Sequence, residues 1–178
     1  MWFSEMVYYP DMVNRMHDTD EHERWMAAAM REAEMAAELG EIPIGAVIVK
    51  DGKIVGRGGN RVETLKDPTA HAEIIAIGAA AETTGYERLL DTTLYVTVEP
   101  CPMCAGAIVL ARIPRLVYGA RDPKMGACGS LYDICGDGKL NHRVDVIEGV
   151  RSGESSAYMQ AFFKELREKK KSSAGDPV

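Results

Sequence analysis

TLYVTVEPCPMC, which spans Thr93–Cys104, is the stretch of sequence that decides the fold. Its apolar and β-branched first half predicts a buried strand, which Pro100 ends. Cys101 and Cys104 then stand at the beginning of a helix that we expect to run to Arg112. A strand that passes directly into a helix is typical of an α/β fold, in which functional groups gather where the strands end.

The rest of the chain supplies strands and helices on both sides of this stretch. Asp51-Gly52 is a strong turn signal and predicts a hairpin of two strands. Strands separated by helices predict a three-layer α/β/α sandwich around a central, mixed, five-stranded sheet. The expected strands are 44–50, 53–58, 93–98, 115–118 and 144–147, and the expected helices are 21–39, 71–83, 104–112 and 152–171.

His71-Ala72-Glu73 begins the helix that precedes the buried strand. One His and two Cys are three zinc ligands, and catalytic zinc sites keep three protein ligands and leave the fourth position to water. Glu73 cannot easily reach the same ion as His71, but it can move protons at the open position. An HxE segment followed by PCxxC is the signature of zinc-dependent nucleobase deaminases.

The CxxC pair has other interpretations when it is taken alone. In a reducing compartment it is also typical of a redox pair or of half a structural zinc site. If Cys128 or Cys135 completed a four-cysteine site, His71 and Glu73 would have no role at the metal. The order of the His, the Glu and the two Cys, with a Pro before the first Cys, favours the catalytic interpretation.

The chain has 178 residues and a net charge of −6. We expect a flexible N-terminal extension over residues 1–19, one zinc-dependent deaminase domain over 20–171 and a flexible tail over 172–178. The acidic balance excludes a protein that coats nucleic acid indiscriminately. Basic residues nevertheless gather in two groups, of which the second also fits a solvated helix end. These groups are Arg112, Arg115, Arg121 and Lys124, and Lys164, Arg167, Lys169, Lys170 and Lys171.

The sequence predicts a cytoplasmic protein without a membrane segment. No stretch reaches the roughly eighteen apolar residues of a membrane span, and the four cysteines form no evident disulfide framework. The N-terminal residues lack the basic and apolar pattern of a secretory signal. Their aromatic side chains also fit a docking arm, but we favour a dispensable extension because chain ends are often unordered.

Beyond the two metal motifs, the chain resembles the bacterial wobble-adenosine tRNA deaminases of the cytidine-deaminase-like superfamily. The resemblance runs from about residue 23 to residue 170. GARDPK at Gly119–Lys124 and NHRV at Asn141–Val144 point to the tRNA branch. The other shared segments are Pro43–Val47, Gly59–Arg61, Asp67–Ala70 and Gly129–Leu131.

The resemblance implies one zinc ion per chain, held by His71, Cys101 and Cys104. It implies that zinc-activated water attacks C6 of adenine while Glu73 transfers the protons, so that ammonia leaves and inosine remains. Asn60 would read the base. It also implies a tRNA anticodon stem-loop as the partner and a homodimer in which both subunits contribute to the site. The further substrate contacts that it implies are Ala72, Asp122, Asn141, His142 and Arg143.

Two other functions share the zinc motifs. A free-base or nucleotide deaminase that acts on guanine, cytidine or deoxycytidylate would have the same metal site, and NHRV and the basic terminal helix favour tRNA. A non-enzymatic zinc-stabilised module is disfavoured by Glu73 and by the missing fourth ligand. Asn60 also fits a turn residue after the second strand, and Cys128 and Cys135 fit small free thiols.

Overall fold

The structure is a computed structural model that describes residues 10–173, with side chains from residue 19 to residue 171. The first helix begins at Pro10, earlier than expected, since proline suits the first turn of a helix. Within the described residues, no helix combines the length and apolar character needed to cross a membrane. The elements are α1 (Pro10–Glu38), β1 (Gly45–Lys50), β2 (Lys53–Gly59), α2 (Val62–Leu65), α3 (Ala72–Thr84), β3 (Thr92–Val98), α4 (Pro102–Leu110), β4 (Arg115–Ala120), β5 (Asp145–Glu148) and α5 (Ser152–Ser173).

A mixed sheet of five strands in the order β2-β1-β3-β4-β5 forms the centre of the domain, as predicted. β1 is antiparallel to both β2 and β3, whereas β3, β4 and β5 are parallel to one another. Val98 of β3 is paired with Ala120 of β4, so both strands end together. The loops that follow β3 and β4 therefore start side by side at the carboxyl edge of the sheet.

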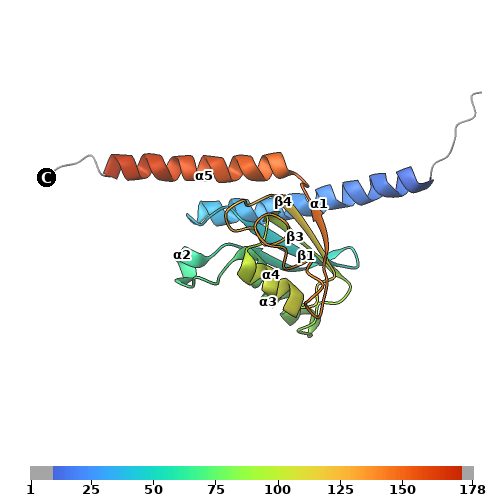
Figure 1. Cartoon of the computed structure of the whole chain (residues 1–178). Helices are drawn as coiled ribbons and strands as arrows, with labels where there is room; N and C mark the ends of the chain where they lie inside the picture. The colour runs from blue at the N-terminus through green and yellow to red at the C-terminus, as the bar shows by residue number, and fades with distance from the viewer. Residues whose placement is uncertain (1–9, 174–178) are drawn as a thin grey trace, which may run out of the picture.

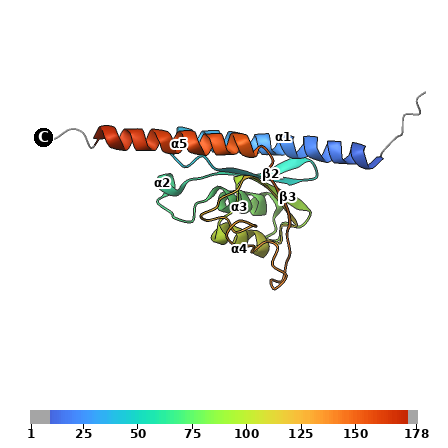
Figure 2. The ribbon, with the colours of Figure 1, turned by 45° about the horizontal axis from the view of Figure 1, so that its top comes forward.

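Helices cover both faces of this sheet, with α1 and α5 on one face and α3 and α4 on the other (Figures 1 and 2). The side chains of β1 alternate between the two faces. Ala46 and Ile48 belong to the apolar cluster with α3 and α4, and Val47 and Val49 belong to the cluster with α1. The three-layer α/β/α sandwich is thus confirmed.

The backbone of α3 lies unusually close to β2 because two glycines face it. A Cβ atom at Gly58 would lie 2.2 Å from the carbonyl oxygen of Ala72, and one at Gly56 would lie 2.4 Å from that of Ala76. Only glycine fits where another backbone approaches a strand this closely. The contact fixes the first turn of α3, which directly follows His71.

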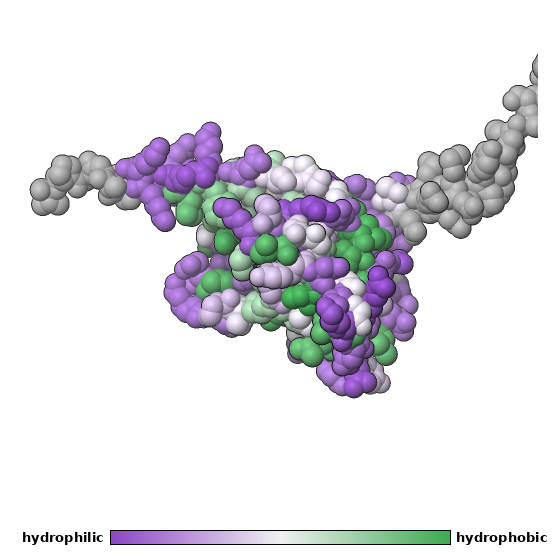
Figure 3. All heavy atoms as spheres, in the orientation of Figure 1, coloured by the Kyte–Doolittle hydropathy of each residue, from purple (hydrophilic) through white to green (hydrophobic). Residues whose placement is uncertain are grey.

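The first half of α5 is anchored on the domain. The Tyr158 hydroxyl donates a hydrogen bond of 2.6 Å to Glu34 of α1, and the Ser155 hydroxyl lies 3.4 Å from the sulfur of Met30. The second half extends beyond the body of the domain, where its surface is hydrophilic (Figures 1 and 3). There Lys169 forms an ion pair of 2.7 Å with Glu165, one helical turn earlier.

Candidate active site

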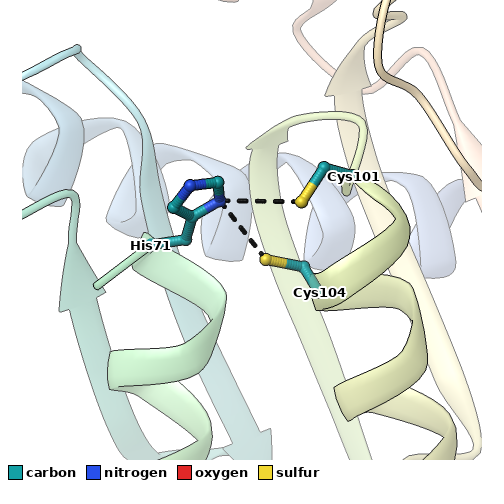
Figure 4. A group of neighbouring side chains, drawn as sticks. All are labelled: His71, Cys101 and Cys104. Carbon is teal, nitrogen blue, oxygen red and sulfur yellow. Dashed lines mark hydrogen bonds between the residues drawn. The ribbon is translucent and has the colours of Figure 1, made fainter. Parts of the chain in front are cut away.

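The three predicted metal ligands meet where α3 and α4 begin. His71 is the N-cap of α3 and Cys101 is the N-cap of α4, with Cys104 in the first turn of α4. Nδ1 of His71 lies 3.7 Å from Sγ of Cys101 and 3.5 Å from Sγ of Cys104 (Figure 4). The three ligand atoms all lie within 4.8 Å of one another, so they can share one ion.

These distances suit a tetrahedral zinc ion. Sulfur at about 2.3 Å and nitrogen at about 2.0 Å from tetrahedral zinc would lie about 3.6 Å apart. Two thiolates and one imidazole are also ligands that zinc prefers. Within the described part of the chain, no other His, Cys, Asp or Glu joins the cluster. The donor set is therefore of the three-ligand kind that catalytic zinc sites use.

The ends of the two helices favour negative charge on the sulfur ligands. Neither N-cap side chain caps its own helix, and the positive ends of both helix dipoles lie at the ligand cluster. A hydrogen bond from the Cys104 thiol, helped by His71, outweighs burial and lowers the pKa of Cys101 to about 4. The same hydrogen bond raises the pKa of Cys104. Cys101 is therefore a thiolate at neutral pH, which is the form that binds metal.

Glu73 lies in the first turn of α3, next to the fully buried Ala72, and is only 4% exposed. It is outside the ligand cluster but lines the same pocket as His71 and Cys101. Burial raises the pKa of its carboxyl group above the usual value. A carboxyl group with a raised pKa can hold and release a proton closer to neutral pH, as general acid–base catalysis requires.

A pocket of about 510 Å³ opens at the ligand cluster. Its walls are largely apolar, and α5 closes one side of it. A few charged groups stand among the apolar side chains, which is the usual character of a site for a small organic group. Besides His71, Glu73 and Cys101, the lining residues are Ile42, Ile44, Val98, Glu99, Ala120, Arg121, Asp122, Lys124, Met125, Ser156, Met159, Gln160 and Phe163.

Asn60 is held beside the pocket by a buried carboxylate. Its Nδ2 donates a hydrogen bond of 3.2 Å to Glu41, and its backbone N–H donates to the carbonyl of Ile44, which lines the pocket. Glu41 also accepts bonds from the backbone N–H groups of Glu63 and Thr64, at 3.2 and 2.6 Å. Burial alone would raise the pKa of Glu41, but these donors outweigh it and the pKa is lowered.

Among the expected substrate contacts, only Asp122 lines the pocket. The others do not, and these are Asn60, Ala72, Asn141, His142 and Arg143. Oδ1 of Asn141 accepts a hydrogen bond of 2.6 Å from Arg112, beyond the C-terminal end of α4. The His142 ring lies 2.8 Å from the carbonyl oxygen of Ile113, also at that end. The cysteine ligands stand at the opposite end of the same helix.

Arg143 lines a second, larger hollow of about 690 Å³. This hollow contains none of the three metal ligands and is bordered by β5 and by Cys128. We locate the active site in the smaller pocket because His71, Cys101 and Glu73 line that pocket and not the larger one.

Cys128 and Cys135 form a separate buried pair. Their sulfur atoms lie 3.4 Å apart, and neither residue belongs to the ligand cluster. The four-cysteine zinc site that the sequence left open is therefore excluded.

Sequence reasoning missed two buried glutamates beside the pocket, Glu41 and Glu99. They are 1% and 3% exposed. Glu41 accepts backbone N–H groups of the short helix α2, and Glu99 accepts those of the loop after β4. One signal was present at Glu99, because an acid that ends a buried apolar strand needs partners. No comparable signal marks Glu41, which follows a helix stop at Gly40.

Comparison with known proteins agrees with this geometry. Residues 20–167 match the family model of MafB19-like deaminases. A tRNA-specific adenosine deaminase of Streptococcus pyogenes serotype M18 is 50% identical over 157 residues, which cover 88% of this chain and 99% of that protein. The chain belongs to the tRNA-specific adenosine deaminases.

Solved structures place this deaminase among enzymes of the same fold. A structure from studies of A-to-I editing by tRNA:A34 deaminases matches it with a TM-score of 0.73 and 49% identity, over 76% of this chain and 98% of that one. A guanine deaminase of Bacillus subtilis matches with a TM-score of 0.55 and 46% identity, over 56% of this chain and 64% of that one. The expected cytidine-deaminase-like fold is therefore confirmed.

Proposed function

We propose that this chain removes the 6-amino group of the wobble adenosine in a tRNA anticodon loop by hydrolysis, which yields inosine and ammonia. The observation that carries the proposal is the His71, Cys101 and Cys104 cluster beside the buried Glu73, in one pocket of about 510 Å³. Membership in the tRNA-specific adenosine deaminases supports the choice of substrate.

We infer that zinc is the resident metal, with one ion per chain. His71, Cys101 and Cys104 would hold it, because their spacing and their chemistry suit zinc. When bound, zinc lowers the pKa of water and so supplies a nucleophile near neutral pH. Cys101→Ala should lower zinc content measured by elemental analysis, and full retention of zinc would contradict this ligand assignment.

Glu73 is the residue that we expect to move protons. It accepts a proton from the attacking water and transfers it to N1 of adenine. It then takes the proton of the new C6 hydroxyl and gives it to the amino nitrogen, so that the C6 carbonyl forms as the C–N bond breaks and ammonia leaves. Its burial at the N-terminal turn of α3 keeps it beside the reacting base without competing for the metal. The apolar walls of the pocket exclude bulk water from these transfers.

Recognition of the RNA would use the rim of the same pocket. Asn60, whose orientation is fixed by Glu41, is our candidate for reading the base. Asp122 and the first turn of α3 at Ala72 are the other expected contacts within this chain. Because an anticodon loop already presents unstacked bases, moving one base into the pocket costs little. A cytoplasmic location and a catalytic domain over residues 20–171 belong to this proposal. Of the expected flexible ends, residues 10–19 belong to α1 and residues 172–173 to α5, and the rest lies outside the described residues.

We further infer a homodimer in which Asn141, His142 and Arg143 of each chain act at the partner's site. Their distance from the ligands along α4 supports this arrangement. Mixing chains that carry Glu73→Gln with chains that carry Arg143→Ala tests it. A mixed dimer regains one site with both native residues only if Arg143 acts on the partner, so activity should reappear on mixing; no recovery would contradict the shared site.

A free-base deaminase is the second candidate, and the 46% identity to a guanine deaminase favours keeping it. An ammonia-release assay on an anticodon stem-loop, free adenosine, guanine and cytidine separates the two. We expect the stem-loop to react far faster than free adenosine, because contacts to remote parts of a substrate help to position its reacting centre. Sequencing should show an A-to-G change at the wobble position. Equal or faster reaction of guanine or cytidine would favour the second candidate.

A further inference from the structure

Glu99 combines burial with an unusual number of hydrogen bonds from one loop. Its Oε1 accepts from the backbone N–H groups of Cys128 and Ser130, both at 3.0 Å. Its Oε2 accepts from the backbone N–H of Asp122 at 3.0 Å and from the Ser130 hydroxyl. All the donors lie in residues 121–130, which follow β4 and are called the 121–130 loop below.

The 121–130 loop wraps tightly around Glu99. A Cβ atom at Gly126 would lie 2.3 Å from the Glu99 carboxylate, so glycine is needed there. Next to it, the backbone N–H of Ala127 donates to the carbonyl of Pro100 at 2.8 Å. The loop is therefore attached to the two residues that immediately precede the metal ligand Cys101.

The same loop forms part of the pocket wall. Asp122, Lys124 and Met125 line the pocket. Oδ1 of Asp122 accepts hydrogen bonds from the backbone N–H groups of Lys124 and Met125, at 2.9 and 3.1 Å. The position of this wall therefore depends on Asp122, whose own backbone N–H is held by Glu99.

We propose that Glu99 is a positioning residue that ties the substrate-facing 121–130 loop to the segment of the metal ligand Cys101. The proposal rests on the proposed function, because the wall that Glu99 positions is taken to contact the RNA. Glu99 is outside the ligand cluster, and its two oxygens are already engaged by the loop. It therefore acts through Asp122 and Lys124.

The hydrogen-bond pattern requires a carboxylate rather than an amide. A Gln side chain has one acceptor oxygen and one NH2 donor. If the NH2 group faced Cys128 and Ser130, it would place a donor against their two backbone N–H donors, and both hydrogen bonds would be lost. If the NH2 group faced Asp122 and the Ser130 hydroxyl, the hydroxyl could rotate and accept a hydrogen bond from it. The backbone N–H of Asp122 would still lose its acceptor. Glu99→Gln should therefore release the Asp122 end of the loop first.

The test combines hydrogen exchange with kinetics on zinc-loaded enzyme. In Glu99→Gln, the amides of Asp122–Met125 should exchange faster than in the native chain, while zinc content stays unchanged. The KM for an anticodon stem-loop should rise about 10-fold with kcat within about 3-fold, since the loop binds substrate rather than reacting with it. Ser130→Ala should raise KM by only about 2- to 3-fold, because one donor is removed and no opposed donor is created.

Glu41→Gln is the matched control, because Glu41 is also buried and accepts backbone N–H groups from a different segment, the short helix α2. It should leave exchange in the 121–130 loop unchanged. Loss of zinc in Glu99→Gln, or a fall in kcat at constant KM, would overturn the proposal and assign Glu99 to the metal centre. Native exchange together with native KM would also overturn it.

If Glu99→Gln fails to fold, Gly126→Ala provides a second route, since it pushes the loop away from an intact carboxylate. It should reproduce the faster exchange and the higher KM, and native values would overturn the proposal. Failure of the native chain to act on RNA would refute the proposed function instead. The hydrogen-exchange comparison would then still decide whether Glu99 holds the loop.

Discussion

Glu73 and Glu99 line one pocket and are both buried, yet their carboxyl groups differ in the direction of their pKa shifts. At Glu73 burial dominates and raises the pKa. At Glu99 burial also acts to raise the pKa, but hydrogen bonds from Ser130, Asp122 and Cys128 outweigh it and lower the pKa. Fixed donors thus favour the charged form of Glu99, which accepts hydrogen bonds from the 121–130 loop. Burial favours the protonated form of Glu73.

The largest expected effect is the loss of turnover when Glu73 can no longer accept a proton. Glu73→Gln keeps the shape of the side chain but cannot accept a proton, so turnover should fall by about 10²- to 10⁴-fold. Zinc content and affinity for the stem-loop should stay native, because Glu73 is outside the ligand cluster. Single-turnover kinetics at several enzyme concentrations measures turnover and affinity, and elemental analysis measures zinc content. Turnover near the native rate would remove Glu73 from the proton-transfer role.

A smaller effect is expected when α3 is moved while both carboxylates are kept. Gly58→Ala places a Cβ atom against the carbonyl of Ala72 and should displace the first turn that carries His71 and Glu73. We expect the free energy of unfolding to fall by about 1–3 kcal/mol, as overpacking usually costs.

Gly78→Ala is the control for this substitution, because a Cβ atom there would meet nothing within 4 Å. It should stabilise the chain by about 0.5–1 kcal/mol, since alanine is a better helix residue than glycine. Chemical denaturation of both variants gives the comparison. Equal stability of the two would mean that the contact between α3 and β2 can relax.

Glu41 is a second buried carboxylate that, like Glu99, accepts hydrogen bonds from backbone N–H groups. In Glu41→Gln one side-chain amide group faces backbone donors, so the free energy of unfolding at neutral pH should fall by about 1–3 kcal/mol. The pKa of Glu41 is lowered in the folded state, so the stabilisation from the charge is complete above the unfolded value of about 4.5. It disappears as the pH falls through the folded pKa. Denaturation between pH 7 and pH 3 should show the two chains converging in acid; a constant difference would contradict the lowered pKa.

The smallest effect is expected farthest from both carboxylates, at the projecting end of α5. Replacing Lys169, Lys170 and Lys171 with Gln should weaken stem-loop binding and flatten its dependence on salt, by about one unit of slope for each phosphate that is no longer neutralised. Turnover of bound substrate should survive. Binding titrations at several salt concentrations measure the slope, with Lys124→Gln at the pocket as the matched variant. Unchanged affinity and slope in the triple variant would leave Lys124 as the better candidate for binding phosphate.

The sequence predicted the cluster of His71, Cys101 and Cys104 because the information for it is local. His71, Cys101 and Cys104 begin helices that follow clear breaks in the chain, so the motif and its structural setting were visible together. The strands were also predicted well, since alternation and β-branched residues mark them. β5 is displaced by one residue, and the short helix α2 was missed because four residues carry no periodic pattern.

The supporting groups around the metal centre could not be predicted in the same way. Three of the four donors to Glu99 are backbone N–H groups 23 to 31 residues away, and any amino acid except proline supplies such a donor. The closure of the pocket by Met159 and Phe163 depends on how α5 crosses the sheet. Apolar periodicity shows that α5 has a buried face but does not show what that face covers.

The two crossovers of the sheet also have a consequence for the order of folding. α3 connects β2 to β3, and α4 connects β3 to β4, while the strands of each pair run in the same direction. Each crossover must close a long segment of chain, so it forms more slowly than the local hairpin of β1 and β2. His71 stands on the first crossover and both cysteines on the second. The cluster of His71, Cys101 and Cys104 therefore comes together only after both crossovers have closed, so its assembly marks a late step in the formation of the sheet.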